Sequence, residues 1–408
     1  MSHSIVLNSM FCLANIDSIN SVEIAATLPL TKIWKTFLPA DSVVLYRAFW
    51  LCWQAVGISS ASCKYFCGFY DLLINVSVTF FYAIHLIVGL FLNPSPADLF
   101  QNLSITITCF VCSVKHYLLR RKLPQIRNVL ALLADLDKRV EGVEEHTYFQ
   151  EELVVGAKNV LKLFSIAYGG ANMAAISATL LSKERRLMYP AWLPFQWDAN
   201  TFSYCAAVIY QIAGVSIQIV QNLANDIYPP MSLCIIAGHV HLLSLRVAKV
   251  GADAKKCKEQ HSHALIECIE DHKKLVRIFQ LTQDTLSQPQ LAQFISSGLN
   301  MCIVLFYLIF YVENVFAYIY YAVYFVSMAF ELLPSCFYGS KLIYEFQQLL
   351  SAIFKCSWLG HQNQRIFVQL SLKEIVPLAG GVIGIQLNSF LGTCKMAYSL
   401  YTVCNRMK

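Results

Sequence analysis

Long apolar runs alternate with shorter polar stretches along almost the whole chain. A helix needs roughly 18 to 20 apolar residues to cross a bilayer, and seven runs reach that length. They cover about residues 65–92, 99–119, 160–181, 201–230, 291–311, 315–337 and 376–403. The pattern predicts an all-α membrane protein with seven transmembrane helices.

The segments between these runs differ in character. If residues 201–250 are helical throughout, they extend roughly 75 Å at about 1.5 Å per residue, more than twice a bilayer core. We therefore expect Met231–Val250 to be a cytoplasmic extension of the fourth helix, kinked at the preceding prolines. Residues 123–157 and 338–375 are polar segments whose patterns are typical of helices. Residues 251–288 are predicted to be a cytoplasmic loop.

The N-terminal segment, residues 1–64, contains an apolar stretch at Val43–Ile58 that Arg47 and Gln54 interrupt. These two residues are seven apart and share one helical face. The pattern favours an interfacial amphipathic helix in a cytoplasmic N-terminus, with a further membrane span as the alternative.

Lys and Arg are concentrated in every second segment between the apolar runs. Residues 115–162 hold nine Lys or Arg, residues 246–277 hold eight and residues 341–373 hold four, whereas residues 182–200 hold three. Because Lys and Arg tend to stay in cytoplasmic loops, this bias predicts a cytoplasmic N-terminus and, with seven spans, an extracellular C-terminus.

Composition agrees with a membrane protein and argues against several other classes. The chain is 57% hydrophobic and only 14% charged. Its net charge of +6 is dispersed, which excludes a nucleic-acid partner. The sequence shows no nucleophile–base set, phosphate-binding loop or metal cluster, so we expect no enzyme activity and no cofactor.

The C-terminal third resembles the insect odorant receptors, which are subunits of a ligand-gated cation channel. The resemblance rests on short motifs in a fixed order: Cys268-Ile269 with His272, Pro289 to Phe294, Glu331 to Gly339, Cys356-Ser357-Trp358, Pro377 to Gly381 and Lys395 to Tyr401. It implies an outer ligand-binding bundle in residues 65–250. It also implies that residues 289–408 form the last three membrane helices, with a cytoplasmic anchor and a pore-lining seventh helix.

The same resemblance implies partners and a location. Subunits of this kind assemble with a shared co-receptor into a heterotetramer, bind volatile small molecules, and lie among membrane lipids in the plasma membrane of olfactory sensory neurons. This chain lacks the cytoplasmic insertion of the co-receptors and therefore resembles a tuning subunit. A gustatory receptor channel of the same superfamily and a G-protein-coupled seven-helix receptor are the alternatives.

The candidate ligand-binding residues lie in the outer halves of the spans. Phe316, Tyr320 and Tyr324 are spaced by four and share a helical face, although ordinary helix packing produces the same stripe. Asn172 and Gln211 are polar within spans, where polar groups face the bundle interior or bond to another helix. Further candidates are Phe100, Ser104, Ile176, Tyr204 and Val208.

The end of the chain holds the candidate gate. By resemblance, Val403 and Met407 match hydrophobic constriction positions that close a pore by dewetting. Asn405 lies near the family's polar pore position, whereas the neighbouring Arg406 is unfavourable in a cation pore.

Overall fold

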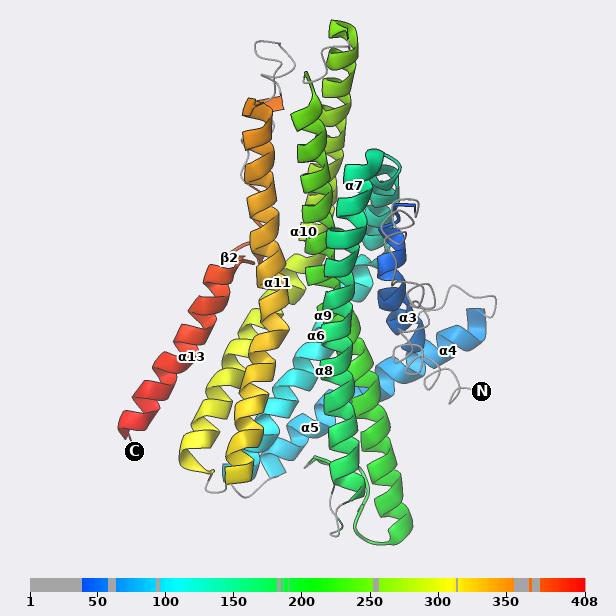
Figure 1. The fold of residues 1–408 in the computed structure, drawn as a ribbon. Coiled ribbons are helices and arrows are strands. Elements are labelled where there is room, and N and C mark those ends of the chain that lie inside the picture. The colour runs from blue at the N-terminus through cyan, green and yellow to red at the C-terminus, as the bar shows by residue number, and fades with distance from the viewer. Residues whose placement is uncertain are drawn as a thin grey trace, which may run out of the picture.

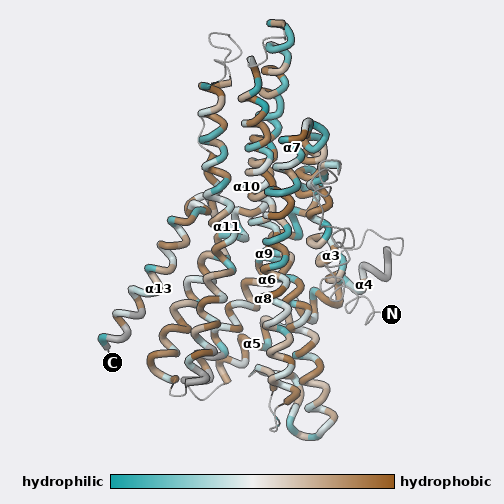
Figure 2. Tube along the Cα trace, viewed as in Figure 1, coloured by the Kyte–Doolittle hydropathy of each residue, from teal (hydrophilic) through white to brown (hydrophobic). Residues whose placement is uncertain are grey.

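The computed structural model describes residues 39–57, 64–92, 96–181, 185, 187–189, 191–251, 257–312, 315–355, 367–368 and 375–407. Long helices run side by side as a bundle, and α9, α10 and α11 extend beyond the others at one end (Figure 1). The extended end carries more polar residues than the rest of the bundle (Figure 2). Six helices in the described parts are long and apolar enough to cross a membrane, and the C-terminal helix α13 is one more helix outside those six.

The N-terminal element is a short 3₁₀ turn, η2 (Val43–Tyr46), followed by helix α3 (Arg47–Ala55). Its amphipathic character is confirmed: Arg47 and Gln54 are exposed, whereas Tyr46, Phe49 and Trp53 are fully buried in the main core. The nine residues of α3 extend only about 14 Å, too short for the alternative of a further span. The apolar face of α3 packs on α9.

The first span consists of α4 (Lys64–Ile74), a π-helical segment η3 (Asn75–Phe80) and α5 (Phe81–Leu92). Side chains of neighbouring helices donate to carbonyls of the π segment. Tyr210 Oη donates to the Ser77 carbonyl at 2.8 Å, and Ser113 Oγ donates to the Thr79 carbonyl at 2.6 Å. A π turn disturbs the regular helical pairing, and these donors stabilise it.

The next helix joins the second predicted span, residues 99–119, to the polar helical stretch that begins at residue 123. Helix α6 (Pro96–Asp137) is continuous for 42 residues and includes Pro124. It packs along α10, and Gln125 Nε2 donates to the Leu281 carbonyl at 3.1 Å one residue beyond the proline. This packing offsets the backbone donor that proline lacks. After α6 come α7 (Gly142–Tyr148), the π segment η4 (Phe149–Leu153) and α8 (Val154–Leu180).

The central helix of the bundle is α9 (Thr201–Lys249). It begins at Asn200, whose side chain accepts a hydrogen bond from the Ser203 N–H at 2.7 Å. The predicted helical continuation of the fourth span is confirmed, because α9 continues through Pro229 and Pro230 to Lys249, whereas its cytoplasmic location stays a prediction. Its middle section is buried on all sides, and the buried residues there include polar ones such as Gln221, Asn225 and Asp226. Polar side chains in such a position bond to neighbouring helices.

The two following helices are longer than predicted. Helix α10 (Lys258–Phe310) includes most of residues 251–288, so that the segment predicted as a loop is helical from Lys258 onward. Helix α11 (Val315–Lys355) passes without interruption from the predicted sixth span into the polar stretch after it. Side-chain packing of α9, α10 and α11 against one another keeps these polar extensions helical.

The seventh span begins later than predicted. Residues 378–384 form a small antiparallel hairpin of β1 (Leu378–Ala379) and β2 (Ile383–Gly384), and helix α13 starts only at Leu387 and ends at Met407. Gly380 and Gly381 lie in the turn with φ of 61° and 73°, a backbone region that favours glycine. The Gly-Gly pair therefore produces a turn where a transmembrane helix was expected.

Candidate ligand-binding and gating site

Two of the predicted ligand-binding residues meet inside the bundle. Ser104 of α6 and Tyr324 of α11 have their hydroxyl oxygens 3.0 Å apart. Ser104 Oγ also donates to Asn300 Oδ1 of α10 at 3.1 Å, and Asn300 Nδ2 donates to Thr108 Oγ1 at 3.1 Å. Three helices are thus joined by one cluster of uncharged polar side chains within the spans. We call Ser104, Asn300 and Tyr324 the polar triad.

Phe100 lies one turn from Ser104 on α6 and packs in an aromatic group. Its ring centroid is 4.8 Å from that of Phe306 and 5.7 Å from that of Tyr311, and Tyr307 lies 4.5 Å from Tyr321. An apolar surround with a few convergent polar groups is the usual chemistry of a small-molecule site. The aromatic group and the polar triad together have this chemistry.

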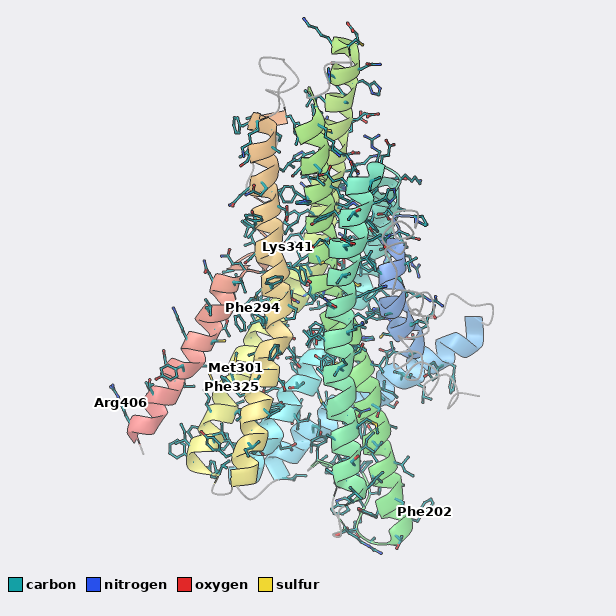
Figure 3. All side chains as sticks on the ribbon, viewed as in Figure 1. Phe202, Phe294, Met301, Phe325, Lys341 and Arg406 are labelled. Atoms are coloured by element: carbon teal, nitrogen blue, oxygen red, sulfur yellow. The ribbon has the colours of Figure 1, made fainter. Side chains whose placement is uncertain are left out.

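A layer of methionines connects this region to α13. Met301 of α10, Met328 of α11 and Ala397 of α13 form a buried cluster, and Tyr324 and Phe325 pack against it. Figure 3 shows Met301 and Phe325 on adjacent helices next to α13. Tyr324 is therefore separated from α13 by one layer of side chains.

The other predicted residues lie on α8 and α9. Asn172 Nδ2 donates to Ser216 Oγ at 3.2 Å, so it makes the helix–helix hydrogen bond that was the alternative to ligand binding. Gln211 is fully buried and bonds to the segment that connects α8 to α9, which we call the outer connection. Its Oε1 accepts from the Met188 N–H at 2.9 Å, and its Nε2 donates to the Tyr189 carbonyl at 2.9 Å.

The three remaining candidates on these helices have mixed surroundings. Val208 is buried, Ile176 is half-buried, and the Tyr204 ring lies 6.4 Å from that of Trp197. Phe316 and Tyr320 lie on α11, but their side chains are outside the described residues, as are those of Asn405 and Met407 on α13. The polar triad therefore lies on α6, α10 and α11, whereas Asn172 and Gln211 lie on α8 and α9.

Helix α13 stands away from the bundle, and its main contacts among the described elements are with α10 and α11 (Figure 1). Ala397 is buried on its inner face, whereas Tyr398 and the candidate gate residue Val403 are more than half exposed. The first turn of α13 is held by the Leu387 N–H, which donates to Ser340 Oγ of α11 at 2.9 Å. Its outer face is free to meet lipid or another subunit.

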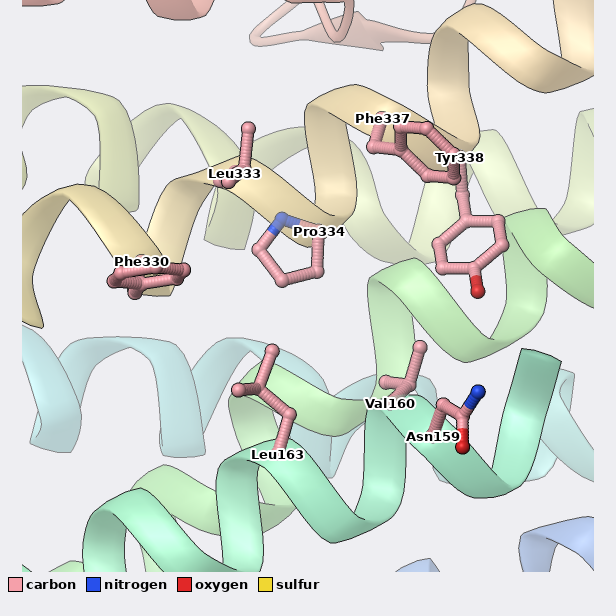
Figure 4. A pocket seen from close by; sticks show the side chains of 8 residues that line it. All are labelled: Asn159, Val160, Leu163, Phe330, Leu333, Pro334, Phe337 and Tyr338. Carbon is pink, nitrogen blue, oxygen red and sulfur yellow. The ribbon is translucent and has the colours of Figure 1, made fainter. Parts of the chain in front are cut away.

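An apolar groove of about 240 Å³ lies between α8 and α11 (Figure 4). It is lined mainly by apolar side chains, including Leu163, Phe330 and Pro334, and the Tyr338 hydroxyl at one end donates to the Gly156 carbonyl at 3.2 Å. The groove opens on the outside of the bundle, because Phe330 is about half exposed. It is therefore distinct from the enclosed polar triad.

One group resembles hydrolytic machinery in composition only. Ser42 Oγ lies 2.7 Å from Asp137 Oδ1 and 2.9 Å from His239 Nε2. The Asp137 carboxylate also approaches the same nitrogen, at 3.3 Å, whereas a catalytic triad uses the two ring nitrogens for the two partners. All three residues are buried, so this group anchors the start of η2. No cluster of metal-ligating side chains occurs in the described part of the chain.

Sequence reasoning missed Asn300 and the other polar residues of α10. Asn300 is fully buried within a predicted span, and a polar residue inside a span was itself a signal of a functional or packing role. Its partners were not predictable, because only the register of α6 against α10 and α11 brings Ser104 and Tyr324 to it.

The fold and this site define a multi-pass helical membrane protein, and comparison with known proteins identifies its family. The 7tm Odorant receptor family model matches residues 95–398. Odorant receptor 33b of Drosophila melanogaster is 41% identical over 370 residues, with 89% of this chain and 97% of that receptor covered. Odorant receptor 33a of the same species is 39% identical over 365 residues, with 88% and 96% covered.

A solved structure has the same fold. The insect olfactory receptor OR5 from Machilis hrabei superposes with a TM-score of 0.70 at 14% identity, with 90% of this chain and 100% of that chain covered. The structure of that receptor in complex with eugenol matches with the same TM-score. The chain belongs to the 7tm odorant receptor family, and it is a receptor rather than an enzyme.

Proposed function

We propose that this chain is the tuning subunit of an odorant-gated, non-selective cation channel in olfactory sensory neurons. A volatile ligand binds among α6, α10 and α11, beside the polar triad and the Phe100 aromatic group. The single observation that carries this assignment is the Ser104–Tyr324 contact of 3.0 Å, which lies one side-chain layer from Ala397 of α13. Ligand binding favours the open state because that state binds the ligand more tightly.

The chemistry of the triad indicates the class of ligand. Hydroxyl and amide groups hold one another in an otherwise apolar and aromatic surround, so a ligand with one oxygen competes for a hydrogen bond there. Small oxygenated volatiles such as alcohols, esters and ketones fit this environment better than hydrocarbons of the same size.

Family membership and the shape of the chain support the remaining parts of the proposal. In the proposed orientation the basic, extended ends of α9, α10 and α11 lie in the cytoplasm and anchor a heterotetramer with co-receptor subunits. The exposed face of α13 lines the pore, and Val403, Asn405 and Met407 form the gate near its end. The chain is embedded in membrane lipid and ends on the outer side.

The proposal is tested by recording currents from cells that express this chain with a co-receptor, against matched oxygenated and hydrocarbon odorants. We expect cation currents only with both subunits present. Ser104→Ala and Tyr324→Phe are expected to raise the EC50 for oxygenated ligands by about 10-fold, the effect of about 1.4 kcal/mol, with normal surface labelling. Ser327→Ala is the matched control, because its exposed hydroxyl donates only to its own helix, at Val323.

Tyr320→Ala tests the predicted aromatic stripe in the same assay. Unchanged dose–response curves for Ser104→Ala, Tyr324→Phe and Tyr320→Ala would remove this site assignment. Epitope tags at the two ends, probed without permeabilisation, test the orientation: only the C-terminal tag is expected to react.

A further inference from the structure

Five helices meet at one polar network in the middle of the bundle, in which Lys115, Asp226 and Gln293 are buried and Tyr168 and Glu331 are half-buried. Lys115 Nζ of α6 lies 2.6 Å from Asp226 Oδ1 of α9, and both side chains are only 4% exposed. Lys115 Nζ also donates to Gln293 Oε1 of α10 at 2.5 Å. The network continues to Tyr168 of α8 and Glu331 of α11. Charged groups inside membrane-spanning helices are costly and therefore call for an explanation.

The number of hydrogens on the Tyr168 hydroxyl determines which of the two acids carries a proton. The Tyr168 hydroxyl is 2.6 Å from Asp226 Oδ2 and 3.1 Å from Glu331 Oε1, but it carries a single hydrogen. The shorter contact identifies Asp226 as the group that accepts it. Glu331 Oε1 then faces a hydroxyl oxygen, and this contact is favourable only if Glu331 carries a proton and donates it to Tyr168.

The other oxygen of Glu331 is consistent with that state. Gln293 Nε2 donates to Glu331 Oε2 at 3.0 Å and to Ser297 Oγ at 3.0 Å, which uses both amide hydrogens. A carboxylic acid has one donor oxygen and one acceptor oxygen, and both are used here. The resulting network holds one ammonium, one carboxylate and one neutral acid, so its net charge is zero.

The titratable groups around Glu331 come from all the packed helices. Lys115 and the buried Cys112 thiol face it from α6, Tyr168 from α8 and Asp226 from α9, and the uncharged Gln293 faces it from α10. The only cation among these groups is paired with Asp226 at 2.6 Å. Glu331 therefore has no positive partner of its own within the described residues.

The network lies in register with the polar triad. Glu331 is seven residues from Tyr324 on α11, and Gln293 is seven residues from Asn300 on α10. Residues seven apart share one face of a helix, two turns distant. The same faces of α10 and α11 are therefore joined to α6 at two successive levels, first through Ser104 and then through Lys115.

We propose that Glu331 is held as a neutral carboxylic acid that donates to Tyr168, and that this five-helix network positions α11 relative to α8 and α10. The proposal deepens the proposed function and rests on it, because the network sets the position from which Tyr324 responds to ligand. Glu331 and Lys115 are positioning residues: they do not touch the ligand site.

Substitutions at Glu331 test the proton directly in current recordings with the co-receptor. Glutamine reproduces the neutral acid, since its Nε2 donates to Tyr168 and its Oε1 accepts from Gln293. We expect Glu331→Gln to keep the wild-type EC50 within about twofold, and Glu331→Met to raise it at least about fivefold, the lower end of typical coupling between sites. Ser327→Ala on the same helix is the matched control.

The ion pair is tested by rescue. Lys115→Met and Asp226→Asn each leave one buried charge without a partner, and we expect each to lose most of the odorant-evoked current. The double variant Lys115→Met/Asp226→Asn removes both charges, and we expect it to recover current, because uncompensated charge is the costly state. Wild-type behaviour of either single variant, or a double variant worse than both, overturns the positioning role of the pair.

The protonation of Glu331 can also be measured by infrared spectroscopy, which does not require a variant to reach the cell surface. Infrared spectra of the purified full-length chain are expected to contain a protonated-carboxyl band that disappears in Glu331→Gln and persists in the double variant Lys115→Met/Asp226→Asn, which has no buried cation to draw the proton from Glu331. Absence of such a band, or loss of current in Glu331→Gln at normal surface level, overturns the neutral acid. A wild-type channel without any odorant current contradicts the proposed function instead and leaves the infrared result to decide the protonation.

Discussion

The side chain of Gln283 pairs with the backbone of Leu378 in both directions. Gln283 Nε2 donates to the Leu378 carbonyl at 2.6 Å, and the Leu378 N–H donates to Gln283 Oε1 at 2.9 Å. One turn further along α10, the Ser287 carbonyl accepts from the Gly380 N–H at 2.9 Å. Helix α10 thus provides the edge on which the hairpin is held, and the hairpin sets where α13 begins.

Removal of this side chain is expected to loosen the hairpin. Gln283→Ala leaves the N–H and carbonyl of Leu378 without their partner, which costs about 1–3 kcal/mol for a buried polar group. We expect a lower thermal-unfolding midpoint for the detergent-purified chain and a reduced odorant-evoked current. Gln348→Ala, at an exposed position of α11, is the control. Equal midpoints for the two variants would show that α10 does not hold the hairpin.

Gly339 is required where α11 meets the hairpin. A β-carbon at this position would overlap the carbonyl oxygen of Ile385, a backbone atom that cannot turn away. Gly339→Ala is therefore expected to displace the start of α13 and to abolish channel current, in spite of the higher helix propensity of alanine.

The matched control for Gly339 is Gly169→Ala on α8. A β-carbon at Gly169 meets no atom within 4 Å in this chain, so the change is expected to leave the fold intact or to stabilise the helix by up to about 1 kcal/mol. Surface labelling and current are measured for both variants. If the Gly339→Ala variant carries as much current as the Gly169→Ala variant, the contact with Ile385 is not the reason for glycine at position 339.

Gln211 is expected to affect the outer connection rather than the ligand. Gln211→Ala removes the partners of the Met188 N–H and the Tyr189 carbonyl, and we expect a lower unfolding midpoint and faster proteolysis near these residues. Relative potencies across an odorant panel should stay in the same order. A changed order of potency with unchanged proteolysis would return Gln211 to the ligand-binding residues.

Cys52 provides a test of how α3 is packed. Burial raises the pKa of its thiol to about 12, so it remains a neutral thiol at pH 8, and the thiolate is the reactive form. We expect an alkylating reagent at pH 8 to modify the exposed Cys257 in the folded chain and Cys52 only after denaturation. Peptide mass spectrometry measures both sites, and labelling of Cys52 in the native protein would contradict the buried position of α3.

Hydropathy predicted where helices exist better than where they end. The helical course of residues 201–249 was predictable, because its apolar character continues, despite the interruption at Asn225-Asp226 and Pro229-Pro230, for longer than any bilayer requires. The second apolar run was expected to close at about residue 119, and α6 continues beyond it, since charged residues end an apolar run but do not end a helix that another helix supports. The Gly380-Gly381 pair is a signal of a hairpin turn, but the apolar residues around it favoured the prediction of a continuous transmembrane helix.

The sequence by itself determined the class of protein: its seven apolar runs, the sorting of its basic residues and its C-terminal motifs are properties of the chain read in one dimension. Only the tertiary structure decided which polar residues belong together. Ser104, Asn300 and Tyr324 are distant in sequence, and their hydrogen bonds depend on the register of three helices. That register results from side-chain packing along entire helices, which no local pattern records.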